Sequence, residues 1–267
     1  MGPLQRETMG TIRMSTLIQT EGLSVGHGRT ALLSGLDLRL GQGELVALIG
    51  VNGCGKSTLL RTLAGLQPAL SGTITVKGLR LQDMTSVERA RAISVVLTGR
   101  PQAGSLDVRT VVALGRQPWT GHLGRSTEAD ERAVEKAIDQ TGIRAFLQRG
   151  LHTLSDGEGQ KVLISRALAQ DTPVMFLDEP TAFLDLVNRV RVLRLLRDIA
   201  HDMAKAVIFS THDVQTAFDL CDRFIVVHDG GAWTGTPAEA LTSGIMDRVF
   251  ADDYLVFDPR SASFRPR

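Results

Sequence analysis

The sequence predicts an α/β fold whose core is a mainly parallel β-sheet. Several short apolar runs have the length and composition of strands that are covered on both faces. They lie at residues 44–49, 93–97, 174–177, 206–210 and 224–227. Helical patterns separate them, and one such helix carries a stripe formed by Val192, Leu196 and Ile199. Strands that alternate with helices favour parallel pairing.

The N-terminal part of the chain predicts a different kind of strand. Residues 17–25 and 73–76 have strand-like composition, and residues 36–40 alternate apolar and polar side chains, as in a half-buried antiparallel strand. A turn is expected at residues 41–43. Residues 1–15 are expected to be a loose N-terminus, ahead of one main domain at residues 16–267.

A strand-poor, helical segment is inserted into this α/β pattern at about residues 99–160. Helices are expected at residues 108–114 and 128–141. In the second, Val134, Ala137, Ile138 and Thr141 share one face. Thr127 followed by Asp130 predicts a capping box at its start.

Composition excludes several classes of protein. The net charge of +1 and the 4% aromatic content argue against a nucleic-acid partner. The two cysteines, Cys54 and Cys221, suit a reducing compartment and offer no disulfide framework. Neither a transmembrane run nor a signal peptide is expected, so the protein is predicted to be soluble, cytoplasmic and able to reach a membrane only by docking.

A glycine-rich loop at residues 50–58 carries the strongest chemical signal. It reads Gly-Val-Asn-Gly-Cys-Gly-Lys-Ser-Thr between an apolar strand and a predicted helix at residues 57–64, which is the context of a phosphate-binding P-loop. The glycines turn backbone N–H groups toward phosphate oxygens, and the helix N-terminus adds positive charge. Lys56 would reach the β- and γ-phosphates of a nucleotide, and the Ser57 hydroxyl would coordinate Mg²⁺. The expected nucleotide-binding residues here are Gly50, Asn52, Gly53, Cys54, Gly55, Lys56, Ser57 and Thr58.

Two adjacent acids follow the apolar run at residues 174–177. Asp178 is expected to hold Mg²⁺ through water, with Ser57 as its partner. Glu179 is placed to orient the attacking water as a general base. Together with the P-loop these residues predict an NTPase. A P-loop alone would still allow a kinase, a GTPase or a helicase.

The segment at residues 154–161, Leu-Ser-Asp-Gly-Glu-Gly-Gln-Lys, separates these classes, because it resembles the signature motif of ABC ATPases. Ser155, Gly157 and the following helix N-terminus would form a second anion site. In that family this site faces the γ-phosphate held by the other subunit of a dimer. The alternative is an ordinary capped helix in which Ser155 and Glu158 form a capping box.

Two further segments resemble the same family. Residues 180–185 are similar to the D-loop, whose aspartate, here Asp185, bridges the subunits. Residues 209–213 are similar to the H-loop, where His212 could donate to the γ-phosphate and help to hold the water. The resemblance covers about residues 17–257, and it implies a P-loop NTPase core with an antiparallel β-subdomain and a helical insert.

The sequence departs from the family pattern at three positions. The aromatic residue that stacks on adenine is replaced by His27, which has less ring area. The Q-loop glutamine position falls on Thr98, which could contact Mg²⁺ through a water, and the nearest glutamine is Gln102. Asp156 adds a carboxylate near the expected γ-phosphate, where a like charge would weaken ATP-driven closure unless Asp156 turns away or pairs with a cation.

Residues 111–118 and 166–170 resemble the ATPase subunits of bacterial iron–siderophore, haem and cobalamin importers. The resemblance implies a homodimer bound to an integral-membrane permease at the cytoplasmic face of the inner membrane, with a substrate-binding protein as an indirect partner. Iron–siderophore uptake is favoured. Haem or cobalamin import, or a soluble ABC ATPase such as an iron–sulfur assembly factor, are the alternatives.

Overall fold

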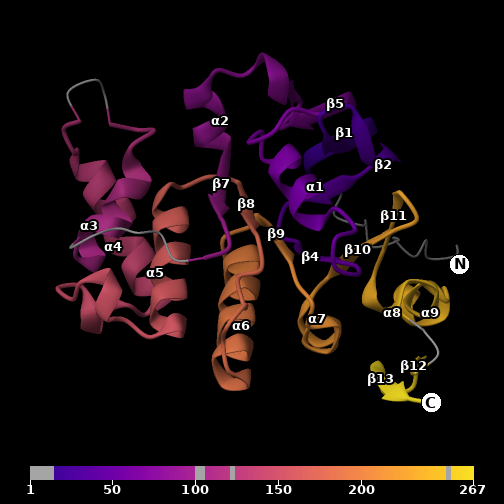
Figure 1. Ribbon diagram of the computed structural model, residues 1–267. Coiled ribbons are helices and arrows are strands. Elements are labelled where there is room, and N and C mark those ends of the chain that lie inside the picture. The colour runs from indigo at the N-terminus through magenta and orange to yellow at the C-terminus, as the bar shows by residue number, and fades with distance from the viewer. Residues whose placement is uncertain (1–14, 100–105, 121–123, 251–253) are drawn as a thin grey trace, which may run out of the picture.

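A six-stranded sheet forms the centre of the molecule (Figure 1). The computed structural model describes residues 15–99, 106–120, 124–250 and 254–267; the expected loose segment at residues 1–15 lies outside them, except for its last residue. The strand order is β11-β10-β4-β9-β8-β7, and all neighbours are parallel except β10 and β11. The parallel sheet is therefore confirmed. Its strands are β4 (Leu45–Ile49), β7 (Ile93–Val96), β8 (Val174–Leu177), β9 (Ala206–Ser210), β10 (Arg223–His228) and β11 (Gly231–Gly235).

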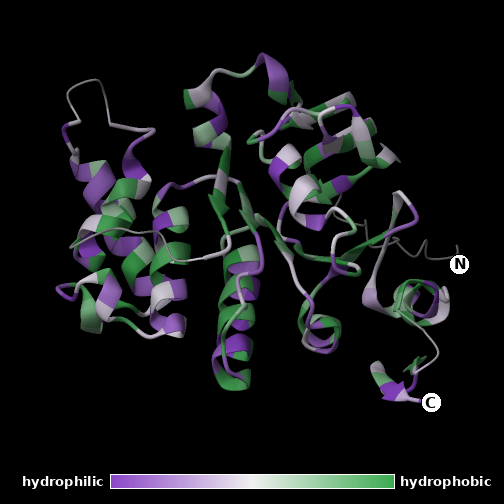
Figure 2. Ribbon diagram, in the orientation of Figure 1, coloured by the Kyte–Doolittle hydropathy of each residue, from purple (hydrophilic) through white to green (hydrophobic). Residues whose placement is uncertain are grey.

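The central strands are apolar throughout because each serves two hydrophobic cores. In β4, Leu45, Ala47 and Ile49 pack in the core that contains α5 and α6, while Val46 and Leu48 pack in the core that contains α1. All five side chains are buried. Figure 2 shows the same strands as a hydrophobic band between more polar helices. A strand that is buried on both faces therefore appears in the sequence as an unbroken apolar run.

A second sheet is antiparallel, with the order β2-β1-β5-β6 and β3 also paired to β1. The single strand expected at residues 36–40 is wrong, because the pairing with β1 is interrupted at residues 37–38, between β2 and β3. The Thr20 hydroxyl donates to the Leu36 carbonyl at 2.7 Å and accepts from the Leu38 amide at 2.8 Å, which replaces the ladder at the break. The strands are β1 (Thr16–His27), β2 (Thr30–Leu36), β3 (Arg39–Gly41), β5 (Ser71–Val76) and β6 (Leu79–Arg80).

Three helices, α3 (Val108–Ala113), α4 (Glu128–Thr141) and α5 (Asp156–Ala169), pack together at the left of Figure 1. The expected helix at residues 128–141 is confirmed, as is its capping box between Thr127 and Asp130. The predicted face of Val134, Ala137, Ile138 and Thr141 is buried. Helices therefore form this side of the molecule, as the sequence predicted.

The remaining helices cover the sheets and lead to a short C-terminal hairpin. Aromatic contacts attach this hairpin, since Phe257 stacks on Phe218 at 5.7 Å and tilts against Phe264 at 5.0 Å. Within the described ranges, no helix is both long and apolar enough to cross a membrane. The other elements are α1 (Lys56–Leu63), η1 (Leu81–Asp83), α2 (Ser86–Ala92), η2 (Leu114–Arg116), η3 (Arg144–Phe146), η4 (Leu151–Thr153), α6 (Leu186–Asp202), α7 (Val214–Leu220), α8 (Pro237–Thr242), α9 (Ile245–Phe250), β12 (Leu255–Asp258) and β13 (Ser263–Pro266).

Candidate functional site

The glycine-rich loop joins β4 to α1, with its backbone in conformations that favour glycine. Gly53 has φ 75° and Gly55 has φ 104°, both in the left-handed region. Gly50 has no room for a side chain, because a Cβ there would lie 2.8 Å from the Cys54 sulfur and 2.9 Å from the Val227 carbonyl oxygen. The strand–loop–helix context of the P-loop pattern is therefore present.

Lys56 lies across the mouth of this loop and is 6% exposed. Its Nζ donates to the carbonyl oxygens of Gly50 and Val51, each at 2.9 Å. Burial lowers the pKa of this ammonium, while the charges of Cys54, Glu179 and Asp178 act in the opposite direction. The lysine thus binds its own loop through neutral carbonyls, and an anionic phosphate would be a stronger acceptor.

Asp178 follows β8 and gathers hydroxyl donors around one carboxylate oxygen. Ser57 Oγ donates to Asp178 Oδ1 at 2.9 Å, and Ser210 Oγ donates to the same atom at 2.8 Å. Asp178 is only 2% exposed. A hydroxyl and a carboxylate are hard oxygen ligands of the kind that Mg²⁺ binds, so this donor set fits the expected ion.

Ser210 has a structural role that sequence analysis did not assign. Besides donating to Asp178, its Oγ accepts the backbone N–H of Glu179 at 2.8 Å, so it ties together the two adjacent acids. A polar residue at the last position of the otherwise apolar strand β9 is the only sequence signal for it.

Glu179 and His212 meet where β8 and β9 end. His212 Nε2 lies 2.8 Å from Glu179 Oε1, and both side chains are partly exposed. Glu179 has φ 48°, a left-handed conformation that is costly for a residue with a side chain. A residue with a strained backbone, whose carboxylate is held by a histidine beside a phosphate loop, is typical of a functional site.

His27 ends β1 near the start of α1. Its ring is exposed, and Nε2 lies 3.2 Å from the Thr58 hydroxyl. The imidazole therefore stands at the edge of the phosphate loop, where a nucleotide base could approach it. The Asn52 side chain is exposed on the same loop.

Ser155 caps α5 in the capping box that the sequence offered as the alternative to an anion site. Its hydroxyl accepts the Glu158 amide at 3.3 Å and donates to Glu158 Oε2 at 3.0 Å. The Ser155 backbone N–H, with smaller contributions from its hydroxyl and from Arg149, lowers the pKa of Glu158. In this single chain, then, the serine donor is already paired. Gly157 is buried in the first turn of α5, where a Cβ would lie 3.1 Å from Asn188.

The residues Ser155, Gly157 and Asp185 do not join the phosphate loop of their own chain. The apolar side of α5 belongs to a different hydrophobic core from that of α1. Asp185 caps α6 by accepting the Asn188 amide at 2.7 Å. Its neighbourhood is apolar and open, because Phe183, Leu186 and Val187 are 85%, 68% and 58% exposed.

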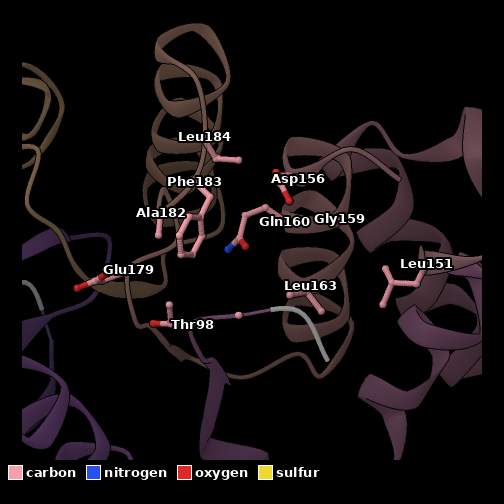
Figure 3. A pocket seen from close by; sticks show the side chains of 11 residues that line it. Thr98, Leu151, Asp156, Gly159, Gln160, Leu163, Glu179, Ala182, Phe183 and Leu184 are labelled. Atoms are coloured by element: carbon pink, nitrogen blue, oxygen red, sulfur yellow. The ribbon is translucent and has the colours of Figure 1, made fainter. Parts of the chain in front are cut away.

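Thr98 lies just past the end of β7, and its Oγ1 donates to the Asp178 carbonyl at 2.8 Å. It therefore touches the backbone of the strand end that carries the two acids. Gln102, the other candidate for this loop, lies outside the described residues. Figure 3 shows Thr98 and Glu179 on one side of a cavity of about 210 Å³, with Asp156 and Gln160 of α5 on the other.

Comparisons with known proteins point to one family. The family model described as ABC transporter matches residues 33–182. The chain is 38% identical to the achromobactin transport ATP-binding protein of Dickeya dadantii over 248 residues, covering 91% of each chain. It is 32% identical to the iron(3+)-hydroxamate import ATP-binding protein of Bacillus subtilis over 247 residues, again covering 91% of each. A solved inward-facing transporter described as of the metal-chelate ABC type matches with a TM-score of 0.78 at 26% identity, covering 94% of this chain and 96% of that chain.

Proposed function

This chain belongs to the ATP-binding subunits of ABC transporters, which are ATPases, and from that premise we propose that it hydrolyses ATP to drive import of a metal chelate, a ferric siderophore, through a membrane permease. The observation that carries the proposal of ATP hydrolysis is the cluster of Ser57, Asp178, Glu179 and His212 beside the glycine-rich loop.

In the proposed mechanism the loop amides and Lys56 bind the phosphates of ATP. Lys56 exchanges the carbonyls of Gly50 and Val51 for the β- and γ-phosphate oxygens, and the charge of the phosphates favours this exchange. Ser57 and Asp178 would hold Mg²⁺, which neutralises charge on the phosphates when bound. The exposed ring of His27 would contact adenine.

Glu179 is proposed to take the proton of the attacking water, and His212 to hold the Glu179 carboxylate in place. Support comes from the 2.8 Å contact between the two side chains. Further support comes from the Ser210 hydroxyl, which fixes the Glu179 amide. Positioning of this kind is what a general base requires.

We further propose that the working unit is a homodimer, in which Ser155, Gly157 and Asp185 of one copy serve the nucleotide of the other. The proposal is supported by the fold, in which α5 and α6 pack in one hydrophobic core and α1, which follows the phosphate loop, packs in the other. It is also supported by the exposed apolar side chains beside Asp185, which suit an interface.

The cargo and the location are inferred from the relatives. Two of them are named for achromobactin transport and iron(3+)-hydroxamate import, so a ferric siderophore is the proposed cargo. The proposed partners are an integral-membrane permease and, indirectly, a substrate-binding protein. The subunit would then sit peripherally at the cytoplasmic face of the bacterial inner membrane.

Co-purification with the permease, followed by measurement of uptake, tests the proposal. The permease encoded beside this gene should be captured with the tagged chain, and the reconstituted complex should import a radiolabelled ferric siderophore only with ATP. Haem or cobalamin uptake without siderophore uptake would change the cargo. Capture of soluble iron–sulfur assembly proteins in place of any permease would refute transport.

A further inference from the structure

Away from the proposed catalytic residues, Trp119 occupies a joint between three parts of the chain. It follows η2 at the end of the α3 segment, and it lies against the end of α2 and the end of α5. In Figure 1, α2 lies above β7, and the group formed by α3, α4 and α5 lies to the left of both. Trp119 is half-buried in this joint.

Two guanidinium groups lie over the Trp119 ring. The Arg91 Cζ is 4.8 Å and the Arg116 Cζ is 5.1 Å from the ring centroid, within the range of cation–π attraction. The indole N–H donates to the Gln170 carbonyl at 2.7 Å, just after α5. Arg91 Nε donates to the Pro118 carbonyl at 2.9 Å. The ring and the polar edge of the indole are therefore both in contact with protein groups.

The surrounding groups make this joint rigid. Arg116 is buried, pairs with Asp130 at 2.9 Å and donates to the Ala169 carbonyl at 2.8 Å. Gly115 allows η2 to touch α5, because a Cβ there would lie 2.2 Å from the Arg166 carbonyl oxygen. The Gln170 amide donates to the carbonyls of Ala90 at 2.6 Å and Ile93 at 2.9 Å. Thus the end of α5 is tied directly to the start of β7.

The elements that meet at this joint carry functional residues at their other ends. From Ile93, β7 runs to Thr98, which touches the Asp178 carbonyl. From the joint, α5 runs back to Ser155 and Asp156. Figure 3 shows these far ends facing each other across the cavity. A tilt at the joint would therefore change the separation of Thr98 from the first turn of α5.

We propose that Trp119, held by Arg91, Arg116 and Gln170, is a positioning residue that fixes the first turn of α5 relative to the Thr98 loop. The inference rests on the proposed function, in which Ser155 must reach a nucleotide in a second copy. It assigns no chemistry to Trp119, which acts only through the two elements that it joins.

The indole combines a flat face for the arginines with a donor for Gln170, so two substitutions separate these contributions. Trp119→Phe retains a ring and loses the N–H, whereas Trp119→Leu removes both. Trp233→Phe is the matched control, because Trp233 is the other tryptophan and lies on β11, away from the joint.

Hydrogen exchange of the isolated subunit gives the first readout. In Trp119→Leu, exchange is expected to become faster at residues 96–99 and 156–160, with Trp119→Phe intermediate and Trp233→Phe unchanged. A merely local role would accelerate exchange only around residues 114–120 and 168–171, and that result would overturn the inference. This hydrogen-exchange measurement does not depend on transport.

Steady-state ATP hydrolysis by the complex with its permease gives the second readout. Trp119→Leu is expected to lower kcat by about fivefold, because both cation–π contacts and the indole hydrogen bond are lost, while the Kd for ATP measured on the isolated subunit stays unchanged. An unchanged kcat, or a Kd that weakens in parallel, would refute the positioning role. If the wild-type complex shows no permease-stimulated hydrolysis, the proposed function fails, and the exchange pattern still decides the role of Trp119.

Discussion

The Nε2 atom of His212 lies 2.8 Å from Oε1 of Glu179, across the ends of two neighbouring parallel strands. Glu179 reaches this position through a left-handed backbone with φ 48°, which the Ser210 hydroxyl stabilises by accepting its amide. Ser210 also donates to Asp178, so one serine links the expected Mg²⁺ ligand to the expected base. The carboxylate is thus placed before any nucleotide arrives.

Replacing Glu179 tests its role as the base. Glu179→Gln keeps the size of the side chain and removes its ability to take a proton, so ATP hydrolysis should slow by about two to four orders of magnitude. ATP binding should survive, and a dimer with trapped nucleotide should accumulate in gel filtration. Glu88→Gln, at an exposed helix cap, is the control. Turnover near that of the wild type would remove Glu179 from the base role.

Cys54 reports on occupancy of the phosphate loop. Its side chain is partly exposed inside that loop, whereas Cys221 is buried and burial raises the pKa of its thiol. Maleimide should therefore modify Cys54 first and inactivate the ATPase, and Mg-ATP should protect it. Mass spectrometry of the two cysteine peptides provides the internal comparison. Equal rates of Cys54 modification with and without nucleotide would place ATP elsewhere.

The buried pair of Asp130 and Arg116 should make stability depend on pH. The Thr127 hydroxyl, followed by its amide and Arg116, lowers the pKa of Asp130 against the opposing effect of burial. The folded state therefore binds this proton less tightly than the unfolded state, whose Asp pKa is about 3.9. The stabilisation is complete above that value and is lost as the pH falls through the lower, folded-state pKa.

Asp130→Asn should accordingly lower the free energy of unfolding by about 3–5 kcal/mol at pH 7, because Arg116 is left buried without its partner. The difference should shrink once the pH is below the folded-state pKa. Urea denaturation at several pH values measures it. Glu128→Gln on the same helix, in an exposed pair with Arg132, should change little. A loss that is the same at every pH would exclude the charge as its cause.

Local sequence patterns predicted the core well, because they are caused by local physics. The helix Glu128–Thr141 and the strands Val174–Leu177 and Ala206–Ser210 have the predicted bounds, since caps and apolar runs define them. The break after Leu36 was not predictable, because it involves the side chain of Thr20, which is distant in sequence. The C-terminal hairpin was missed for the same reason, since long-range aromatic contacts attach it.

The candidate site also has residues that the sequence predicted and residues that it did not. Motif spacing identified the glycine-rich loop, Asp178, Glu179 and His212, and the fold brings these residues together. Spacing gave no role to Ser210 or Trp119, because their partners come from other strands and helices. It also left the Ser155 capping box open as an alternative, and only the geometry shows that the box forms.

The loop after β7 is where we expect this chain to depart from the family's glutamine, and Thr98 is our candidate for that position. Its hydroxyl already donates to the Asp178 carbonyl, so it connects the acids to the loop that would receive the permease. Thr98→Ala should therefore reduce permease-stimulated ATPase more than basal ATPase. Thr98→Ser, which retains the hydroxyl, should restore most of the stimulation.

Gln102→Ala provides the opposing test, because Gln102 is the other candidate and lies outside the described residues. If Thr98 holds the position, Gln102→Ala should leave the basal ATPase of the isolated subunit within a few-fold of normal. Both activities can be measured in lipid, with and without the permease. A collapse of basal hydrolysis in Gln102→Ala, with Thr98→Ala unaffected, would reverse the assignment. The shorter threonine would then be only a backbone support for Asp178, and the loop would have to bring Gln102 back to the Mg²⁺ site.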